Sequence, residues 1–219
     1  MNLVSRKYKA AFLHIPKNGG TTITKILRGE GDFTHSISFD RHWNINNTSF
    51  DKIRNAGYYI FTFVRNPYTR FLSGWKAMKL ASISARHNPY DGLQPKNNDV
   101  VLSKEEFQKN YKLLLERSNI NIDKDKRLFD YNFNFSQTHI IKLHLNSIKN
   151  VTKIHRFENF NYETEEILTK FGIIINDIKV ENKSQPVSPD EWINQEVATY
   201  IEDKYEEDFL NFNYRKRDK

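Results

Sequence analysis

Short runs of hydrophobic residues predict buried strands, and the more mixed residues 151–155 predict a third strand. Residues 8–15 and 58–64 are nearly continuous in apolar side chains. Such runs are typical of strands that are covered on both faces of a parallel sheet. Each run is followed by a segment with helical spacing of apolar residues, so the pattern predicts an α/β fold with a parallel sheet flanked by helices.

End signals place the helices between these strands. Gly29 and Gly31 end the first helix, Pro67 begins another, and Gly172 ends a third, while Ser103 opens a capping box. Helices are expected at residues 22–27, 51–55, 68–80, 103–117 and 163–171. One final helix is predicted from residue 188, with Trp192, Ile193, Val197, Tyr200 and Ile201 on its apolar side. Residues 87–99 and 119–134 are predicted as loops.

Length and composition narrow the class of protein. The 219 residues fit a single domain, which is expected to span residues 1–219. The absence of cysteine excludes disulfides, thiolate zinc sites and cysteine nucleophiles, and it favours a reducing compartment such as the cytoplasm. No run of eighteen apolar residues predicts a membrane span. The pattern carries no signature of an oligomeric state.

The charge is basic but dispersed. There are 34 basic and 27 acidic residues, a net charge of +7. A basic excess can serve nucleic acid, a membrane surface or a small anionic ligand. No nucleic-acid motif accompanies it, so a nucleic-acid partner is not expected. The basic tail at residues 215–219 is predicted to be a solvated end.

The clearest candidate for chemistry is the loop after the first strand, His-Ile-Pro-Lys-Asn-Gly-Gly-Thr-Thr at residues 14–22. A strand, a glycine-rich loop and a helix start present backbone N–H groups to an anion, here with Lys17 beside them. Gly19 and Gly20 allow close approach to a ligand. The alternative is an ordinary corner with a solvated Lys17, and His14 is expected to be a packed residue rather than a catalyst.

A second candidate anion site follows the second strand. Arg65 stands just past the strand, at the edge where α/β sheets bind ligands. Arg70 and Ser73 are spaced i, i+3 and share a helix face, so a guanidinium and a hydroxyl are available to a phosphate. The alternative is that Arg65 caps carbonyls or pairs with a carboxylate.

Together the two units resemble the paired cofactor motifs of sulfotransferases that use 3′-phosphoadenosine 5′-phosphosulfate (PAPS), most closely the family-2 type that includes carbohydrate sulfotransferases. The matching segments are residues 14–22, 63–73, 154–160, 180–184 and 205–212. A family-typical Thr is replaced by Asn18, whose backbone and side-chain amide are expected still to donate. The resemblance implies the sulfotransferase fold, with a P-loop-like parallel sheet. Eukaryotic relatives typically carry a membrane anchor and disulfides. This sequence shows neither feature, so a soluble, cytoplasmic, bacterial enzyme is expected.

The resemblance also implies a role for each matched residue. Lys17 would bind the 5′-phosphosulfate and stabilise charge on the bridging oxygen as sulfate leaves, without a metal. The cofactor-binding residues would be Pro16, Lys17, Asn18, Gly19, Gly20, Thr21 and Thr22 at the 5′ end, and Arg65 and Ser73 at the 3′-phosphate. His35 is the favoured catalytic base for the acceptor hydroxyl, with His42 second. The acceptor implied is a carbohydrate hydroxyl, and residues 85–101 and 118–135 are expected to shape its pocket.

Two alternatives remain. A nucleotide-dependent phosphotransferase would carry Gly-x-x-x-x-Gly-Lys-Ser/Thr, but Gly20 stands where that motif has its Lys, and Arg65 stands where an acidic magnesium ligand would follow the strand. A non-catalytic binding protein with the same fold would recognise a sulfated or phosphorylated partner. Turnover with PAPS separates the sulfotransferase from both.

Overall fold

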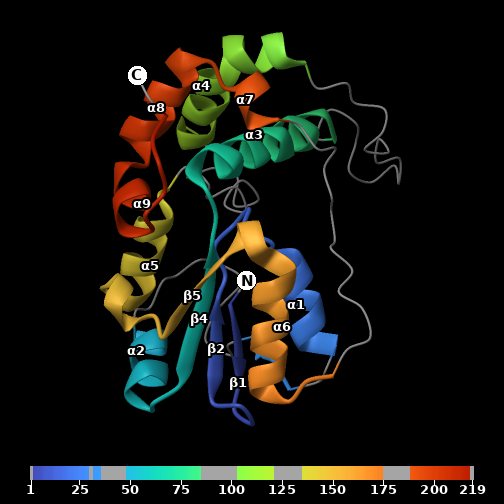
Figure 1. Cartoon of the computed structure of the whole chain (residues 1–219), viewed down its shortest axis with the longest axis vertical. Coiled ribbons are helices and arrows are strands. Elements are labelled where there is room, and N and C mark those ends of the chain that lie inside the picture. Colours follow the sequence, from blue (N-terminus) through green and yellow to red (C-terminus); the bar gives the residue numbers. More distant parts are fainter. Residues whose placement is uncertain are drawn as a thin grey trace.

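The computed structural model describes residues 2–29, 32–35, 48–84, 103–120, 135–174 and 188–217. Within these ranges the strands are β1 (Leu3–Ser5), β2 (Ala10–Leu13), β3 (Thr34–His35), β4 (Tyr59–Val64) and β5 (Lys153–Arg156). They form one sheet in the order β3-β1-β2-β4-β5 (Figure 1). Strands β2, β4 and β5 run parallel, as predicted. Strand β1 is an antiparallel addition between β2 and β3 that the apolar pattern did not separate.

The described helices surround this sheet. They are α1 (Gly20–Gly29), α2 (Thr48–Asn55), α3 (Pro67–Ser84), α4 (Lys104–Ile120), α5 (Gln137–Leu145), α6 (Phe160–Phe171), α7 (Pro189–Trp192), α8 (Gln195–Lys204) and α9 (Glu206–Asn211), with short 3₁₀ turns at Ile148–Asn150 and Phe157–Asn159. The α/β prediction is confirmed. In the described part of the chain, no helix is both long and apolar enough to span a membrane.

Alternating residues of the central strands build two cores. Phe12, Phe61 and Phe63 pack with α1 and α6 on one face. Leu13 and Val64 pack with α2 and α5 on the other face. Since successive strand residues point to opposite faces, each strand serves both layers. Figure 1 shows the sheet between the α1–α6 pair and the α2–α5 pair.

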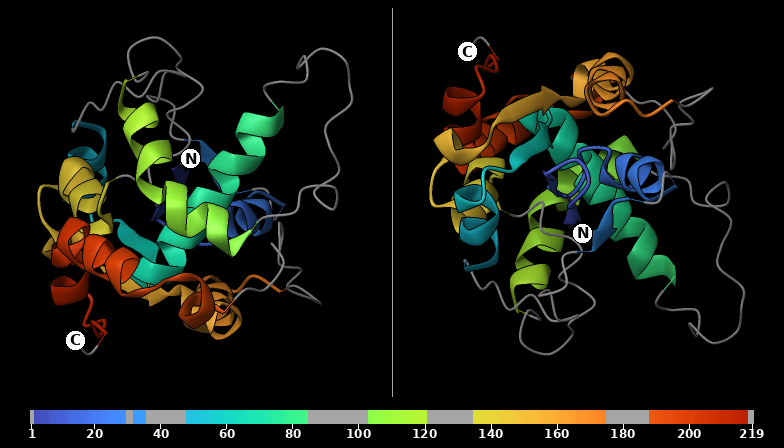
Figure 2. Two further views of the ribbon diagram at one scale, coloured as in Figure 1. Left: turned by 90° about the horizontal axis from the view of Figure 1, so that it is seen from above. Right: turned by 90° about the horizontal axis from the view of Figure 1, so that it is seen from below.

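A third core lies where β4 leads into α3. It joins α3, α4, α7, α8 and α9 through buried side chains that include Trp75, Phe107, Trp192, Ile201 and Phe209. Figure 1 shows α3, α4, α7 and α8 above the sheet. Figure 2 gives two views turned by 90° from Figure 1, one from above and one from below. The loops that follow β2 and β4 therefore lie between the sheet and this group of helices.

The predicted final helix is wrong in one respect, because it is two helices. Helix α7 ends at Trp192, and Asn194 then caps α8 by accepting a hydrogen bond from the Val197 N–H at 3.0 Å. The break turns Ile193 into the core while both helices keep their apolar sides buried. Helix α5 has no counterpart among the predicted helices. Its residues Gln137, Thr138 and His144 are polar yet buried, so apolar residues mark only part of its buried face in the sequence.

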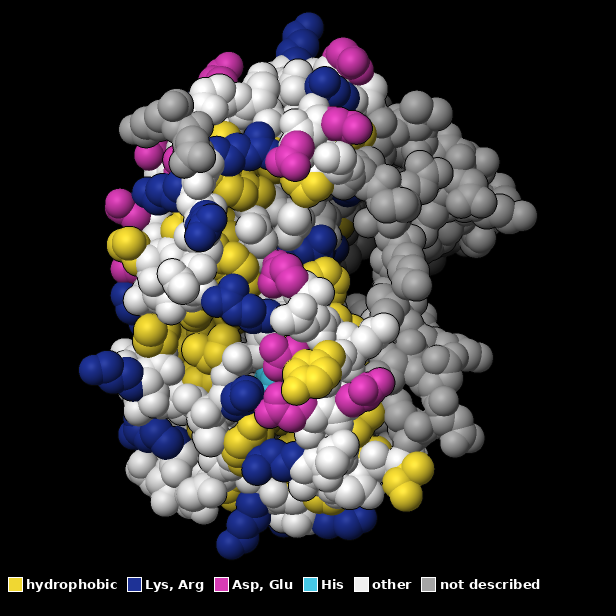
Figure 3. All heavy atoms as spheres, in the orientation of Figure 1, with side chains coloured by type: hydrophobic (Ala, Val, Ile, Leu, Met, Phe, Trp, Pro, Cys, Tyr) yellow, Lys and Arg dark blue, Asp and Glu magenta, His cyan; other side chains and the backbone are white. Residues whose placement is uncertain are grey.

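The basic tail is not simply a solvated end. Arg217 donates to the Pro189 carbonyl at 3.1 Å, bonds to Asp190 at 2.7 Å, and also donates to the Ile193 carbonyl. Its guanidinium also lies over the Tyr68 ring. On the face drawn in Figure 3, basic and acidic side chains are interspersed, and no large patch of one sign is visible.

Candidate functional site

The two predicted anion loops meet at the ends of adjacent parallel strands. Leu13 of β2 pairs with Thr62 of the parallel strand β4, so the loops that follow the two strands leave the sheet at the same edge. Arg65 Nη1 donates to the Lys17 carbonyl at 3.1 Å, which joins the second loop to the first. The two segments, 48 residues apart in sequence, form one local structure.

The first loop has an unusual backbone. Lys17 has φ of 71° and Gly19 has φ of 77°, both in the left-handed region. For a lysine this conformation costs about 1–3 kcal/mol, and such strain is concentrated at functional sites. Helix α1 begins at Gly20 with no acidic residue in its first turn, so its positive end is not neutralised locally.

Gly20 is required by the packing of His14. A Cβ atom at Gly20 would lie 1.9 Å from His14 Nε2, well inside contact distance. Burial, together with the positive charge of Lys17, holds the pKa of His14 well below its usual value. His14 is thus a neutral packing residue, as predicted from its place at the end of a strand.

Replacing Gly20 with alanine should lower the free energy of unfolding by about 1–3 kcal/mol, because the new methyl group overlaps the His14 ring. In a His14→Ala background the same substitution should cost nothing, since the ring is gone. A four-variant denaturation cycle measures this coupling. Equal costs of Gly20→Ala in both backgrounds would contradict the packing explanation.

Lys17, Arg65 and Arg70 form a cluster of cations around the meeting point. Burial lowers the pKa of Lys17 to about 8, and repulsion from Arg65 and Arg70 adds to the effect. Burial likewise lowers the pKa of Arg65 to about 10, against the opposing attraction of Glu158. Among the described residues no carboxylate pairs with Lys17. The cluster therefore favours a bound anion that would replace the missing negative charge.

Arg65 is held so that part of its guanidinium stays available. Its Nε donates to Thr69 Oγ1 at 3.0 Å, its Nη1 donates to the Lys17 carbonyl, and its Cζ lies 4.3 Å from the centre of the Phe157 ring. Among the described residues Nη2 has no acceptor. Arg65 does contact a carbonyl, as the alternative reading held, yet it keeps donors for a ligand.

Arg70 has a supporting role instead. It is buried, and it donates to the Pro16 carbonyl at 3.2 Å and the Phe135 carbonyl at 2.9 Å. Its guanidinium is also 6.0 Å from the centre of the Tyr205 ring. The interpretation of Arg70 and Ser73 as a joint phosphate clamp is therefore not supported for Arg70. Ser73 lies three residues further along α3 and is partly buried.

The expectation that the Asn18 amide donates to a ligand is wrong. Asn18 is buried, and its Nδ2 donates to the Phe63 carbonyl and to Gln137 Oε1, both at 2.7 Å. Both amide hydrogens are thereby used inside the protein, which leaves the backbone of Asn18 for a ligand. Gln137 is in turn bonded to the backbone of Arg65, so it connects the two loops.

A known protein family matches nearly the whole chain, including both loops. The model of a family described as the sulfotransferase family matches residues 2–215. The chain belongs to the sulfotransferase family. The match includes both loops and the segments that support them. No curated protein and no solved structure matches the chain.

The later segments of the sulfotransferase resemblance turn out to support the loops. Phe157 stacks on Arg65, and Glu158 accepts a hydrogen bond from the Asn66 N–H at 2.7 Å at the start of α3. Asp208 accepts bonds from the N–H groups of Gln137 and Thr138, both at 2.8 Å. Sequence reasoning assigned no role to Asp208, and its only signal was its place in a weak matching segment. Residues 180–184 lie outside the described residues.

Of the two candidate catalytic histidines, His35 belongs to the described residues. His35 ends strand β3, where it pairs with Leu3, which itself pairs with Phe12 of β2. This register sets the His35 backbone level with the end of β2, two strands away. His42 lies outside the described residues, as do residues 85–101 and most of the second predicted acceptor loop.

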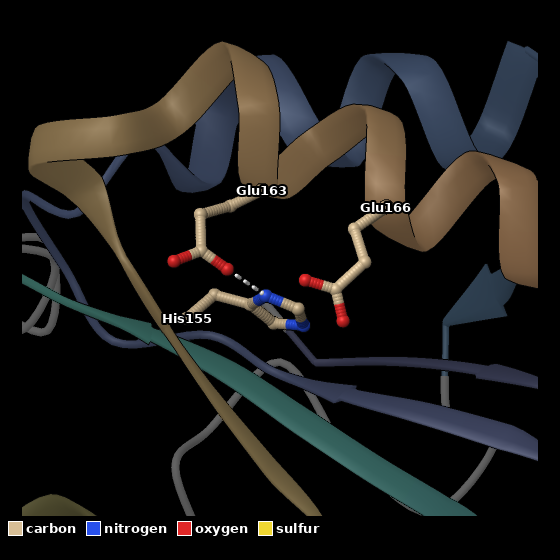
Figure 4. Close-up of side chains that lie close together, drawn as sticks. All are labelled: His155, Glu163 and Glu166. Atoms are coloured by element: carbon tan, nitrogen blue, oxygen red, sulfur yellow. Dashed lines mark hydrogen bonds and ion pairs between the residues drawn. The ribbon is translucent and has the colours of Figure 1, made fainter.

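Another group of titratable residues lies under α6 of the sulfotransferase. His155 is fully buried, and its Nδ1 is 2.6 Å from Glu163 Oε2, while Glu166 points toward the same place (Figure 4). These groups could hold a metal, since their ligand atoms lie within 4.8 Å of one another. Lys153 already pairs with Glu166 at 3.2 Å. The His155–Glu163 bond joins β5 to α6.

Proposed function

We propose that this sulfotransferase moves a sulfuryl group from PAPS to a hydroxyl of a carbohydrate. The observation that supports it best is the junction of the two loops, where Arg65 Nη1 donates to the Lys17 carbonyl at 3.1 Å. Two cations with distinct positions suit a donor with two separate phosphate groups. Burial lowers the pKa values of both cations, and repulsion from neighbouring arginines adds to the effect, which indicates a site built for negative charge.

The proposed reaction is an in-line displacement. The acceptor oxygen forms a bond to sulfur while the bond from sulfur to the bridging phosphate oxygen breaks, and adenosine 3′,5′-bisphosphate leaves. Lys17 and the N-terminus of α1, from Gly20 to Thr22, stabilise the charge that develops on the bridging oxygen. Arg65 and Ser73 bind the 3′-phosphate. In this scheme no metal is needed, because a lysine and backbone dipoles supply the electrostatic stabilisation.

His35 is proposed to accept the proton of the attacking hydroxyl, which makes it a general base. Its support is the register of β3, which sets it level with the end of β2 near the Lys17 loop. A carbohydrate acceptor and a bacterial, cytoplasmic setting rest on the family resemblance and on the cysteine-free composition.

Neither alternative accounts for the site equally well. A phosphotransferase that uses magnesium needs a carboxylate after a strand, and β4 is followed by Arg65. A non-catalytic binding protein would not need Lys17 in a strained backbone with a lowered pKa. These observations favour the transferase, and turnover distinguishes all three.

Calorimetric titration with adenosine 3′,5′-bisphosphate, with ATP as the comparison and magnesium omitted, tests the proposal. We expect micromolar or tighter binding of the bisphosphate and at least tenfold weaker binding of ATP, because ATP lacks a 3′-phosphate for Arg65. Transfer of labelled sulfate from PAPS to a panel of oligosaccharides then identifies the acceptor. Equal binding of both nucleotides, or a magnesium requirement, would refute the proposal in favour of a general nucleotide enzyme.

A further inference from the structure

Gln137 lies between the two loops and is bonded to both. It is fully buried at the first position of α5. Its Oε1 accepts from Asn18 Nδ2 at 2.7 Å and from the Arg65 N–H at 2.8 Å. Its Nε2 donates to the Arg65 carbonyl at 2.8 Å. One amide therefore holds the backbone of the second loop in a fixed relation to the side chain of the first.

Gln137 is itself anchored from the far end of the chain. Asp208 of α9 is fully buried and accepts from the Gln137 N–H at 2.8 Å and from Gln137 Nε2 at 3.3 Å. It also accepts from the Thr138 N–H at 2.8 Å. A carboxylate at a helix N-terminus is favourably placed for the helix dipole. Asp208 thus orients both the backbone and the side chain of Gln137.

The two segments that Gln137 holds carry the two cations, Lys17 and Arg65. Arg65 is bonded through its own N–H and C=O, so its Cα position depends directly on Gln137. Asn18 is bonded through its side chain and directly follows Lys17. Further hydrogen bonds between the same segments run from Asn18 to the Phe63 carbonyl, from Arg65 to the Lys17 carbonyl and from Arg70 to the Pro16 carbonyl.

We infer that Gln137, anchored by Asp208, is a positioning residue that sets the spacing between the 5′ and 3′ phosphate sites. This inference rests on the proposed function. A nucleotide with phosphates at both ends gains affinity from its second contact only if the two sites are held at the matching distance. Losing Gln137 should therefore weaken the binding of a nucleotide that occupies both phosphate sites more than the binding of one that occupies a single site.

The test compares three nucleotides on one set of variants. In Gln137→Leu, which keeps most of the side-chain volume and removes the amide, we expect affinity for adenosine 3′,5′-bisphosphate to fall at least tenfold. Affinity for adenosine 5′-monophosphate and adenosine 3′-monophosphate should fall less than threefold. Gln108→Leu is the matched control, because the Gln108 amide bonds to the Trp192 carbonyl between α4 and α7 and touches neither loop. It should leave all three affinities unchanged.

The outcomes separate this inference from the proposed function. A wild-type protein that binds the bisphosphate no tighter than the monophosphates would overturn both. Tight wild-type binding with the same losses for all three nucleotides in Gln137→Leu would leave the proposed function standing and overturn the positioning role. If Gln137→Leu does not fold, Asp208→Asn serves instead, because it keeps the Gln137 amide but removes the carboxylate that orients it between the loops. The same selective loss for the bisphosphate is expected, and its absence would overturn the inference.

Discussion

Replacing Lys17 with methionine should reduce sulfuryl transfer by at least about 100- to 1,000-fold, the usual cost of losing one electrostatic group at a developing negative charge. The same change should make the ligand-free sulfotransferase more stable. Burial and the nearby Arg65 and Arg70 lower the pKa of Lys17 to about 8. A buried charge that is disfavoured in the folded state is removed by methionine, which has a similar length and no charge.

The sign of the stability effect follows from the pKa. In the unfolded chain the pKa of Lys17 is near 10.5, above its folded value of about 8. Below pH 8 the lysine is charged in both states, so the folded state bears the full cost of the buried charge. Above about pH 10.5 it is neutral in both states and the cost is gone. The stabilisation by Lys17→Met should be about 1–3 kcal/mol at pH 7 and should shrink as the pH rises from 8 to 10.5.

Thermal unfolding with and without adenosine 3′,5′-bisphosphate measures both effects. At pH 7 the melting temperature of the free variant should rise by roughly 2–4 °C per kcal/mol, and added bisphosphate should raise it much less than it raises the wild type. Bisphosphate binding to the wild type should also weaken as the pH rises through about 8, because Lys17 loses its charge. A free variant that is less stable than the wild type, with full transfer activity, would exclude Lys17 from the anion site.

Replacing Arg65 with alanine should weaken adenosine 3′,5′-bisphosphate binding by about 10- to 100-fold, the worth of one or two charge-assisted hydrogen bonds. The effect on adenosine 5′-monophosphate should be smaller, because that nucleotide lacks the phosphate that Arg65 is proposed to bind. Arg65→Lys should recover less than half of the lost binding free energy. A lysine keeps the charge, but it has no planar group to lie over the Phe157 ring, and it cannot bond to Thr69 and to the Lys17 carbonyl at the same time.

Arg54→Ala is the matched control, because Arg54 pairs with Asp51 on α2, on the other side of the sheet from α1. Its removal should leave nucleotide affinity unchanged. In Arg65→Ala, the pH at which residual binding is lost should move upward, since repulsion from Arg65 contributes to the lowered pKa of Lys17. Calorimetry across the pH range measures both quantities. Unchanged affinity for the bisphosphate in Arg65→Ala would remove the second loop from the site.

Much of the fold could be predicted because its signals are local. Residues 8–15 and 58–64 contain β2 and β4, since strands buried on both faces need continuous apolar residues, and residues 151–155 overlap β5, which ends at Arg156. Gly172 ends α6 in the left-handed conformation, as expected of a helix-ending glycine. Helix α5 was missed because its buried face includes polar side chains that find partners only in the folded protein.

The sequence by itself determined the loop chemistry: a glycine pair after a buried strand, Lys17 beside it, and Arg65 after the next strand. These features depend on neighbours within a few residues, so they can be read from the chain. Only the tertiary structure showed that Asn18 faces inward, that Arg70 supports the first loop, and that Gln137 and Asp208 hold the loops together. Asn18 and Gln137 are 119 residues apart, and Gln137 and Asp208 are 71 apart. Hydrogen bonds over such separations follow no periodicity, because they depend on how the layers pack rather than on the local pattern.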